Sequence, residues 1–386
     1  MGKGFYSPDS FKILSGREPQ AKMNFLCGLA LFFGNWLTGE IDEYQPRNIL
    51  LTGGAGFIGS HVTVKLVEKY PDYRVIVLDK GDYCSAEENL KSVLQNERFK
   101  FVHGDIRSKS LIDYLLREEQ IDTIMHFAAS THVDNSFGTS IGFTINNVVG
   151  THVLLEAARE YGKLERFIHV STDEVYGGET QLLQTEESLL APTNPYACTK
   201  AAAEYICRAY LMSFNLPIVM TRGNNVYGPH QYPDKLIPKS ICLLQEGKSA
   251  FVHGDGTPTR NYVFVDDCVH AFDIILHRGS PGGVYNIGSD QEKSNLQVVK
   301  DIIQFMNLKA DRVEHVEDRA FNDERYRIDS TKLLDLGWRQ EVRWEVGLQL
   351  TIDWYGNKQN LERWPSWRSG LVPHPQLGVP AQQELI

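Results

Sequence analysis

The feature that most constrains this chain is a glycine-rich turn set between an apolar strand and a helix. Residues 48–51 are a short apolar run, and Gly53, Gly56 and Gly59 follow it directly. Glycines at this spacing permit a tight turn and let backbone N–H groups approach a pyrophosphate at the positive end of the helix. The pattern predicts a dinucleotide-binding strand, turn and helix.

An acidic residue at the end of the next strand indicates which dinucleotide is bound. Asp79 closes the apolar run 74–78 and stands 20 residues after Gly59. A carboxylate there accepts hydrogen bonds from both ribose hydroxyls and repels a 2′-phosphate, which favours NAD over NADP. Lys80 is a nearby cation that weakens this preference.

Further apolar runs alternate with helical patterns along the next 150 residues. Continuous apolar strands separated by helices are typical of a parallel sheet covered on both faces. The chain therefore predicts a doubly wound α/β fold with a smaller C-terminal substrate lobe. The expected strands are 48–51, 74–78, 99–102, 123–127 and 166–170, and the expected helices are 61–70, 108–119, 143–161 and 196–213.

The expected domains follow from this regularity and from where it stops. They are an N-terminal extension at 1–46, a Rossmann domain at 47–227 with returning segments near 260–288, a mainly substrate-binding lobe at 228–358 and a loosely held C-terminal tail at 359–386. The apolar run 25–37 is shorter than the ~20 residues that cross a bilayer and lacks the features of a secretory signal, so no membrane association is expected.

Composition excludes some partners and favours a compartment. The chain has 39 basic and 49 acidic residues and a net charge of −10, the wrong sign for a protein that grips nucleic acid. Its six cysteines have no zinc spacing and are expected to be free thiols, so no metal is predicted and the cytoplasm is the expected location.

A second motif carries reactive groups to the end of the fifth strand. Thr172, Asp173 and Glu174 follow an apolar run, at the sheet edge where ligands of such folds bind. Tyr196 and Lys200 lie one helical turn apart, so the ammonium is expected to lower the phenol pKa and produce a general base. The expected cofactor contacts are Gly53, Gly56, Phe57, Ile58, Gly59, Asp79, Lys80, Asp105, Ile106, Ala128, Ala129, Tyr196 and Lys200.

With these motifs in place, residues 47–355 resemble the extended short-chain dehydrogenase/reductase superfamily, and within it nucleotide-sugar 4,6-dehydratases of the dTDP-glucose type. The resemblance covers about four fifths of the chain. It rests on the segments Thr52–His61, His126–Ala129, His132–Asp134, Ser171–Gly177, Asn224–Pro229 and Lys235–Pro238, and on Tyr196 with Lys200. The Thr-Asp-Glu sequence is the discriminating part, since epimerases lack the acid pair and decarboxylases typically have Thr-Ser-Glu.

The resemblance implies conversion of dTDP-glucose to dTDP-4-keto-6-deoxyglucose through transient hydride transfer to bound NAD. Tyr196, helped by Lys200, would take the proton of the sugar 4-hydroxyl, which Thr172 would hold. Glu174 would remove the proton on carbon 5, and Asp173, its pKa raised by the neighbouring carboxylate, would protonate the departing 6-hydroxyl.

Three alternatives stay open. A UDP-glucose 4,6-dehydratase on a rhamnose route is the first, because a methyl in an apolar pocket discriminates by only ~1–3 kcal/mol. An NAD-dependent nucleotide-sugar epimerase or decarboxylase is the second. A binding module that has kept the fold and lost turnover is the third.

The resemblance also implies a substrate site and a homodimer. The dimer would use the helices near 143–161 and 196–213. Ser130 and Phe321 depart from the family pattern near the expected sugar site. The expected contacts with the nucleoside diphosphate hexose are His132, Thr172, Asn225, Lys235, Arg260, Asn286, Arg319 and Tyr326.

Overall fold

The structure is a computed structural model that describes residues 43–178, 182–319 and 321–374. The chain divides into two units, Met1–Tyr44 and Gln45–Ile386, and the fold described here belongs to the second. The expected N-terminal extension, with its apolar run, lies outside the described residues apart from 43–46.

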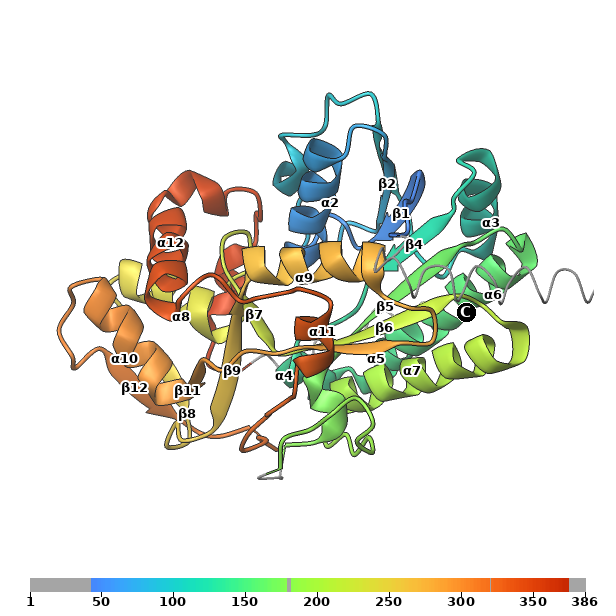
Figure 1. The fold of residues 1–386 in the computed structure, drawn as a ribbon. Coiled ribbons are helices and arrows are strands. Elements are labelled where there is room, and N and C mark those ends of the chain that lie inside the picture. Colours follow the sequence, from blue (N-terminus) through green and yellow to red (C-terminus); the bar gives the residue numbers. More distant parts are fainter. Residues whose placement is uncertain (1–42, 179–181, 320, 375–386) are drawn as a thin grey trace, which may run out of the picture. The chain divides into compact units, whose positions relative to one another are not determined.

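Seven parallel strands form the central sheet in the order β10-β6-β5-β4-β1-β2-β3 (Figure 1). This order reverses between β1 and β4, as in doubly wound dinucleotide-binding folds, and confirms the predicted fold class. The strands are β1 (Asn48–Thr52), β2 (Arg74–Asp79), β3 (Phe99–His103), β4 (Thr123–His126), β5 (Arg166–Thr172), β6 (Ile218–Gly223) and β10 (Val284–Ile287).

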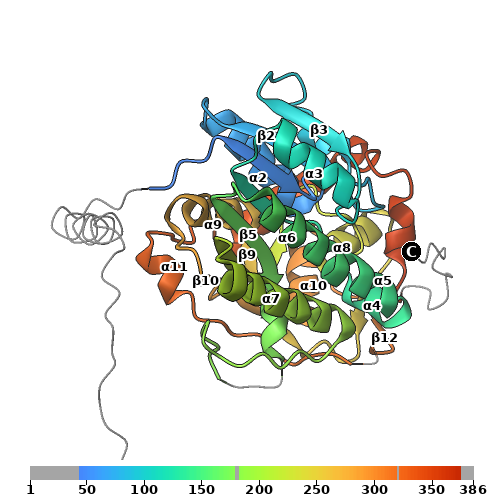
Figure 2. The ribbon, with the colours of Figure 1, turned by 90° about the vertical axis from the view of Figure 1, so that its right-hand side faces the viewer.

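Helices cover both faces of this sheet because its strands are apolar on both sides. Ile49 and Leu51 of β1 pack on the side of α2 and α9, and Leu50 packs on the side of α3, α6 and α7. Figure 2 shows the second group lying together on one side of the sheet. These helices are α2 (Phe57–Lys69), α9 (Val265–Arg278), α3 (Lys109–Glu118), α6 (Gly150–Tyr161) and α7 (Pro195–Phe214).

The later part of the chain adds two small sheets and their helices. β7 (Asn225–Tyr227), β9 (Thr259–Phe264) and β11 (Glu292–Ser294) form one sheet, and β8 (Ala250–His253) pairs with β12 (Val313–Val316). The accompanying helices are α8 (Leu236–Gln245), α10 (Asn295–Phe305), α11 (Thr331–Asp335) and α12 (Trp344–Gly356). The division into a Rossmann domain and a lobe at residue 227 stays a prediction.

One expected helix differs from the structure. The stretch predicted as a helix at 143–161 consists of the end of α5 (Ser140–Phe143), a π-helical turn (Thr144–Val149) and α6. α4 (Val133–Gly138) precedes it. The π-helical turn points Asn147 at α7, where its Nδ2 donates to Thr199 Oγ1 at 3.0 Å.

The expectation of a loosely held C-terminal tail is wrong for the described part of residues 359–386. Trp364 is 1% exposed and Leu371 is also buried. Two short 3-10 helices, Lys358–Leu361 and Trp367–Leu371, carry this segment across the surface. The aromatic side chains hold it in place, because Trp364 packs against Tyr232 and Trp354.

Three further observations concern the described residues. No helix among them is long and apolar enough to cross a membrane. No group of three or more His, Cys, Asp or Glu side chains in the described ranges is placed to hold a metal ion. Their free cysteines are Cys84, Cys198, Cys207, Cys242 and Cys268.

Candidate active site

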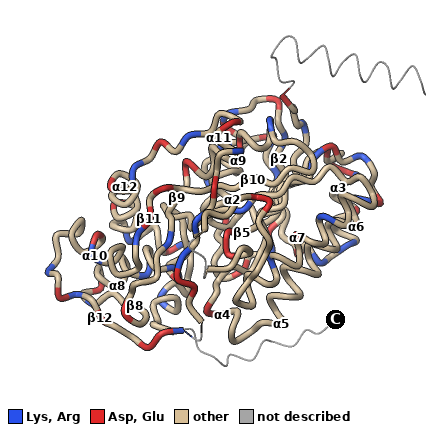
Figure 3. Tube along the Cα trace, turned by 60° about the horizontal axis from the view of Figure 1, so that its bottom comes forward, with Lys and Arg blue, Asp and Glu red and all other residues tan. Residues whose placement is uncertain are grey.

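A cleft of about 2020 Å³ opens at the carboxyl ends of the central strands. It extends from the glycine-rich turn after β1 to the side chains of β9 and α8. Figure 3 shows both basic and acidic positions in the region between β5 and β9. Every residue predicted for the site lines this cleft except Asp173 and Asn286.

The glycine-rich turn is packed too closely for any side chain. Gly53 has φ +72°, and a Cβ there would lie 2.6 Å from the backbone nitrogen of Ala128. A Cβ on Gly59 would lie 2.3 Å from the Gly53 carbonyl oxygen. Gly56 caps α2 without a side-chain hydrogen bond, so no side chain of the cap blocks the approach to the helix N-terminus. These residues fit the pyrophosphate of a dinucleotide.

The carboxylate of Asp79 is fixed by the backbone around it. Its Oδ2 accepts from the Ala55 N–H at 3.0 Å and its Oδ1 accepts from the Gly81 N–H at 2.9 Å. Each oxygen keeps a second lone pair for a ribose hydroxyl. Lys80 pairs with Asp82 at 2.9 Å, so a neighbouring carboxylate offsets the cation expected to weaken the NAD preference.

At the end of β5, Thr172 and Glu174 face the cleft while Asp173 turns away from it. The Thr172 hydroxyl donates to Asp173 Oδ1 at 3.1 Å, and Asn224 Nδ2 donates to Asp173 Oδ2 at 2.6 Å. Asn194 Nδ2 donates to Glu174 Oε2 at 2.9 Å. The structure therefore places Asp173 behind Thr172, against the expectation that both carboxylates face the sugar directly.

The pKa values of both carboxyl groups are raised above their ordinary values. Burial, together with the charge of Glu174, raises the pKa of Asp173 to about 7. Burial also raises the pKa of Glu174 above its ordinary value. The pair thus supplies an acid that is protonated near neutral pH and a second group able to exchange a proton.

The relation between Tyr196 and Lys200 corrects one expectation. Burial and the nearby charges of Glu174 and Asp173 raise the pKa of the Tyr196 phenol, where a lowered value was predicted. Lys200 Nζ donates to the Val170 carbonyl at 2.6 Å, and burial lowers the pKa of Lys200 to about 8. Lys200 is anchored on the strand, and two carboxylates dominate the field at the phenol.

The opposite wall of the cleft carries the predicted cations, and each has a partner. Lys235 pairs with Asp234 at 3.0 Å and Arg319 with Asp134 at 3.3 Å. The Arg260 guanidinium donates to the Asp323 carbonyl at 2.9 Å and lies 4.7 Å from the centre of the Tyr326 ring. Fixed cations of this kind suit a diphosphate.

His132 and Asn225 also line this part of the cleft. His132 Nδ1 accepts from the Asn135 N–H at 3.3 Å and caps α4, while burial lowers the pKa of its imidazole to about 4. A neutral imidazole at that place accepts or donates hydrogen bonds without adding charge.

Asn286 does not reach the cleft, which corrects the expectation of a substrate contact. It is fully buried, and its Oδ1 accepts from the Tyr176 hydroxyl at 2.9 Å. Its Nδ2 donates to the Asp329 carbonyl at 2.9 Å. The amide hydrogen-bonds β10 to the neighbouring loops, so Asn286 is a structural residue next to the site.

Sequence reasoning missed three polar residues of the site. Asn194 caps α7 by accepting from the Ala197 N–H, and the sequence carried no signal for its second bond, to Glu174. The sequence also carried no signal for the bond between Asn224 and Asp173. Lys239 also lines the cleft, and its spacing of four from Lys235 on α8 could have identified it.

Comparisons with known proteins show which chains this one resembles. Residues 50–351 match the family model described as GDP-mannose 4,6 dehydratase. A trifunctional UDP-glucose 4,6-dehydratase/UDP-4-keto-6-deoxy-D-glucose 3,5-epimerase/UDP-4-keto-L-rhamnose-reductase of Arabidopsis thaliana is 52% identical over 338 residues, which are 86% of this chain and 51% of that protein. This chain spans about half the length of such plant relatives.

Two further proteins match this chain over nearly their whole length. The dTDP-D-glucose 4,6-dehydratase of Bos taurus is 46% identical over 343 residues, which are 87% of this chain and 96% of that protein. A dTDP-glucose 4,6-dehydratase of Streptomyces venezuelae, solved with NAD bound, has a TM-score of 0.79 at 39% identity and covers 83% of this chain and 99% of its own. The resemblance found in the sequence is confirmed.

Proposed function

Since this chain belongs to the GDP-mannose 4,6 dehydratase family, we propose that it is an NAD-dependent nucleotide-sugar 4,6-dehydratase that converts dTDP-glucose to dTDP-4-keto-6-deoxyglucose. The observation that carries the proposal is the acid pair Asp173 and Glu174, held by Asn224 and Asn194 beside the buried phenol of Tyr196. Oxidation at one carbon and elimination at the next both need proton transfer, and this group of residues supplies it.

The reaction divides among the side chains by position. NAD, held by the glycine-rich turn and Asp79, would supply the redox chemistry as acceptor and later donor of one hydride. Its positive charge in the oxidised form would offset the burial and carboxylates that raise the Tyr196 pKa, so that the Tyr196 phenolate can take the proton of the 4-hydroxyl. The ketone so formed acidifies carbon 5. Glu174 removes the carbon 5 proton, and Asp173 gives its proton to the departing 6-hydroxyl, which leaves as water. Glu174 returns its proton to carbon 5 when carbon 6 is reduced.

Asp173 reaches that step only through a small rearrangement, because Thr172 stands between its carboxyl group and the cleft. The Thr172 hydroxyl bonds Asp173 Oδ1 and also lies where it can bond the sugar. A proton can pass along this hydroxyl, or the Asp173 side chain can turn as the sugar binds. Either route keeps the acid protonated and away from bulk water until the substrate is in place.

The cofactor is held by residues whose shapes fit it. Gly53, Gly56 and Gly59 leave the helix N-terminus open to the pyrophosphate, and Asp79 takes the ribose hydroxyls. Lys200, fixed on the Val170 carbonyl, stands at the end where Tyr196 acts.

UDP-glucose is the second candidate substrate, and one finding favours it. The plant relatives whose names give UDP-glucose 4,6-dehydratase are 51–52% identical to this chain, against 44–47% for relatives named dTDP-D-glucose 4,6-dehydratase. The two bases differ by one methyl, which is worth only ~1–3 kcal/mol in an apolar pocket.

The test is mass spectrometry of the purified full chain incubated separately with dTDP-glucose and UDP-glucose. We expect loss of one water without net NADH, and faster turnover of the dTDP sugar. Faster turnover of UDP-glucose would replace the first substrate with the second. If neither sugar loses water while the protein holds NAD, the epimerase, decarboxylase and binding-module alternatives take precedence.

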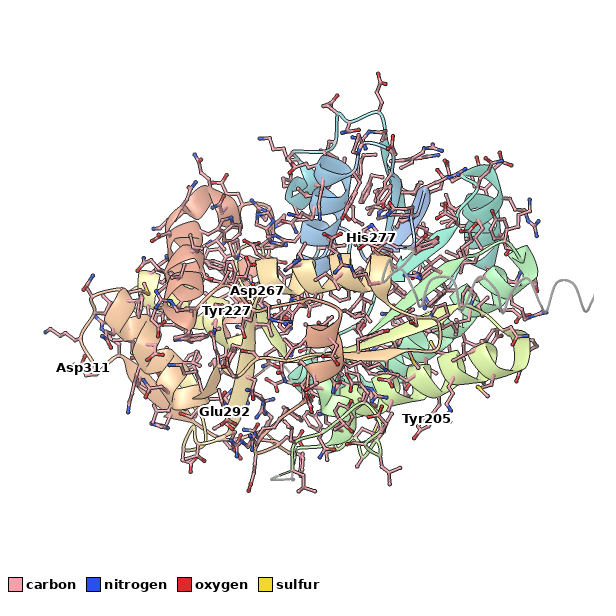
Figure 4. The ribbon with its side chains drawn as sticks, in the orientation of Figure 1. Tyr205, Tyr227, Asp267, His277, Glu292 and Asp311 are labelled. Atoms are coloured by element: carbon pink, nitrogen blue, oxygen red, sulfur yellow. The ribbon has the colours of Figure 1, made fainter. Side chains whose placement is uncertain are left out.

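We also propose a homodimer and a cytoplasmic location. One face of α7 supports the dimer, since Tyr205 and Met212, two helical turns apart, are 59% and 70% exposed there. Tyr205 is labelled in Figure 4. Ile141 and Val149, near α6, are exposed as well. Light scattering should give twice the 43.8 kDa chain mass, and one chain mass would contradict the dimer. Cell fractionation tests the location.

A further inference from the structure

The C-terminal segment after α12 is joined to the glycine-rich turn by a short series of hydrogen bonds. Arg363 Nη1 donates to Asn89 Oδ1 at 2.6 Å, across 274 residues of sequence. Asn89 Nδ2 in turn donates to the Ala55 carbonyl at 2.9 Å. Ala55 lies inside the turn, between Gly53 and Gly56. Neither Asn89 nor Arg363 lines the cleft.

The Ala55 residue is held at both of its backbone polar groups. Its N–H donates to Asp79 Oδ2 at 3.0 Å, on the side of the expected ribose site. Its carbonyl accepts from Asn89 Nδ2 and from the Ala86 N–H at 3.0 Å. Ala55 and Asn89 are both buried, so water cannot replace these bonds at no cost.

Arg363 is itself fixed, which makes it a usable anchor. Its Nε donates to the Asn360 carbonyl at 2.7 Å, and its guanidinium lies 4.9 Å from the centre of the Trp354 ring. No carboxylate in the described residues forms an ion pair with it. Its charged Nη1 donates to the Asn89 amide oxygen, and a charged donor strengthens that bond.

We propose that Asn89 and Arg363 are positioning residues for the dinucleotide: they hold the Ala55 carbonyl, and through it the glycine-rich turn and Asp79, in the geometry that binds NAD. This inference rests on the proposed function for the identity of the cofactor. It makes Arg363 of the C-terminal segment a support of the cofactor site, although this residue lies far from the glycine-rich turn in sequence and does not line the cleft.

Asn89→Asp is the sharpest variant. The carboxylate has nearly the same shape and keeps Arg363 as a partner, but it loses the donor to Ala55 and sets a negative oxygen against that carbonyl. We expect the NAD dissociation constant, measured by calorimetry, to rise about tenfold. The KM for the sugar at saturating NAD should change little, and the melting temperature should fall only modestly, because the salt bridge to Arg363 offsets part of the lost bond.

Arg363 is tested by a graded pair with a matched control. Arg363→Ala should weaken NAD binding about threefold, and Arg363→Lys should restore part of it by keeping a charged donor. Arg368→Ala removes an arginine from the same segment that pairs with Glu246 on the surface, and NAD binding should not change. NAD binding equal to wild type in Asn89→Asp would overturn the proposal.

A loss of NAD binding in Asn89→Asp matched by an equal rise in sugar KM and a large fall in melting temperature would also overturn it, because that pattern is general unfolding. Calorimetry with NAD alone needs no turnover. Its result therefore stands even if neither glucose nucleotide loses water, a result that would count against the proposed function only.

Discussion

The two ends of the cleft are built in different ways. At the cofactor end, Gly53 and Gly59 belong to the turn after β1 and the start of α2, and Asp79 ends β2. Close backbone packing and backbone hydrogen bonds fix these residues. At the sugar end, Lys235 and Arg319 come from distant segments, and ion pairs between side chains fix them. A site built from backbone tolerates almost no added volume, whereas a site built from ion pairs loses affinity gradually as charges are removed.

The largest effect is expected where the two ends meet. Tyr196→Phe removes the phenol oxygen and keeps the ring, so both ligands should still bind while dehydration falls about 10²–10⁴-fold. Turnover is followed by mass spectrometry and NAD binding by calorimetry. Tyr205→Phe, on the exposed face of α7, is the control and should keep full activity. Substantial activity in Tyr196→Phe would remove this residue from the mechanism.

The next effect belongs to the sugar end. Asp173→Asn cannot give a proton, so dehydration should fall about 10²–10³-fold while sugar binding persists. With a pKa of about 7, Asp173 is protonated at lower pH, so the step that needs this acid should slow as pH rises through about 7.

The same raised pKa makes a stability prediction of known sign. The folded state binds a proton at Asp173 that the unfolded chain releases near pH 3.8, so stability should fall as pH rises from there to about 7. Asp173→Asn should flatten this part of the curve of unfolding free energy against pH, measured in a pH series of urea unfolding.

The pH dependence of activity tests the catalytic role separately. A dehydration rate that rises above pH 7 would contradict the assignment of Asp173 as the acid.

At the cofactor end, Gly53→Ala tests the packing of the turn. A Cβ at φ +72° is strained and meets the backbone of Ala128 at 2.6 Å, so NAD affinity should fall about thirtyfold, together with some stability. Gly247→Ala is the matched control, because Gly247 has φ +76°, a Cβ there meets nothing within 4 Å, and the residue does not line the cleft. Equal NAD affinity in the two variants would mean that the turn is not the cofactor site.

The smallest effect is a lost cation at the sugar end. Lys235→Ala should raise the KM for the nucleotide sugar about tenfold with kcat nearly unchanged, since a partly exposed charge contributes to binding in both ground and transition states. Lys248→Ala removes an exposed lysine near the end of α8 and should leave both constants as they are. A fall in kcat without a change in KM would place Lys235 in the chemistry.

The sequence predicted what depends on short stretches of chain. The strand, turn and helix around Gly53, the carboxylate that ends the next strand and the parallel sheet followed from local patterns of glycines, apolar runs and helical spacing. The predictions that failed needed contacts between distant segments. Asn286 is turned inward by Tyr176 and Asp329, and the field at Tyr196 comes from carboxylates whose direction no spacing reveals.

The C-terminal segment illustrates the same limit. Its prolines and polar residues indicate a tail when considered alone, yet Trp364 is buried and Arg363 reaches Asn89. Such a contact can be identified only in the folded structure, since no local sequence pattern around Asn89 or Arg363 indicates the other residue.

The π-helical turn Thr144–Val149 has a consequence for how this fold tolerates change in length. Each residue of an α-helix turns the chain by about 100°. Deleting one residue from the π-helical turn would make α5 and α6 one regular α-helix. The deletion would rotate the two helices relative to each other and break the bond between Asn147 and Thr199. Insertions and deletions accepted elsewhere on the surface should therefore be rejected in this segment.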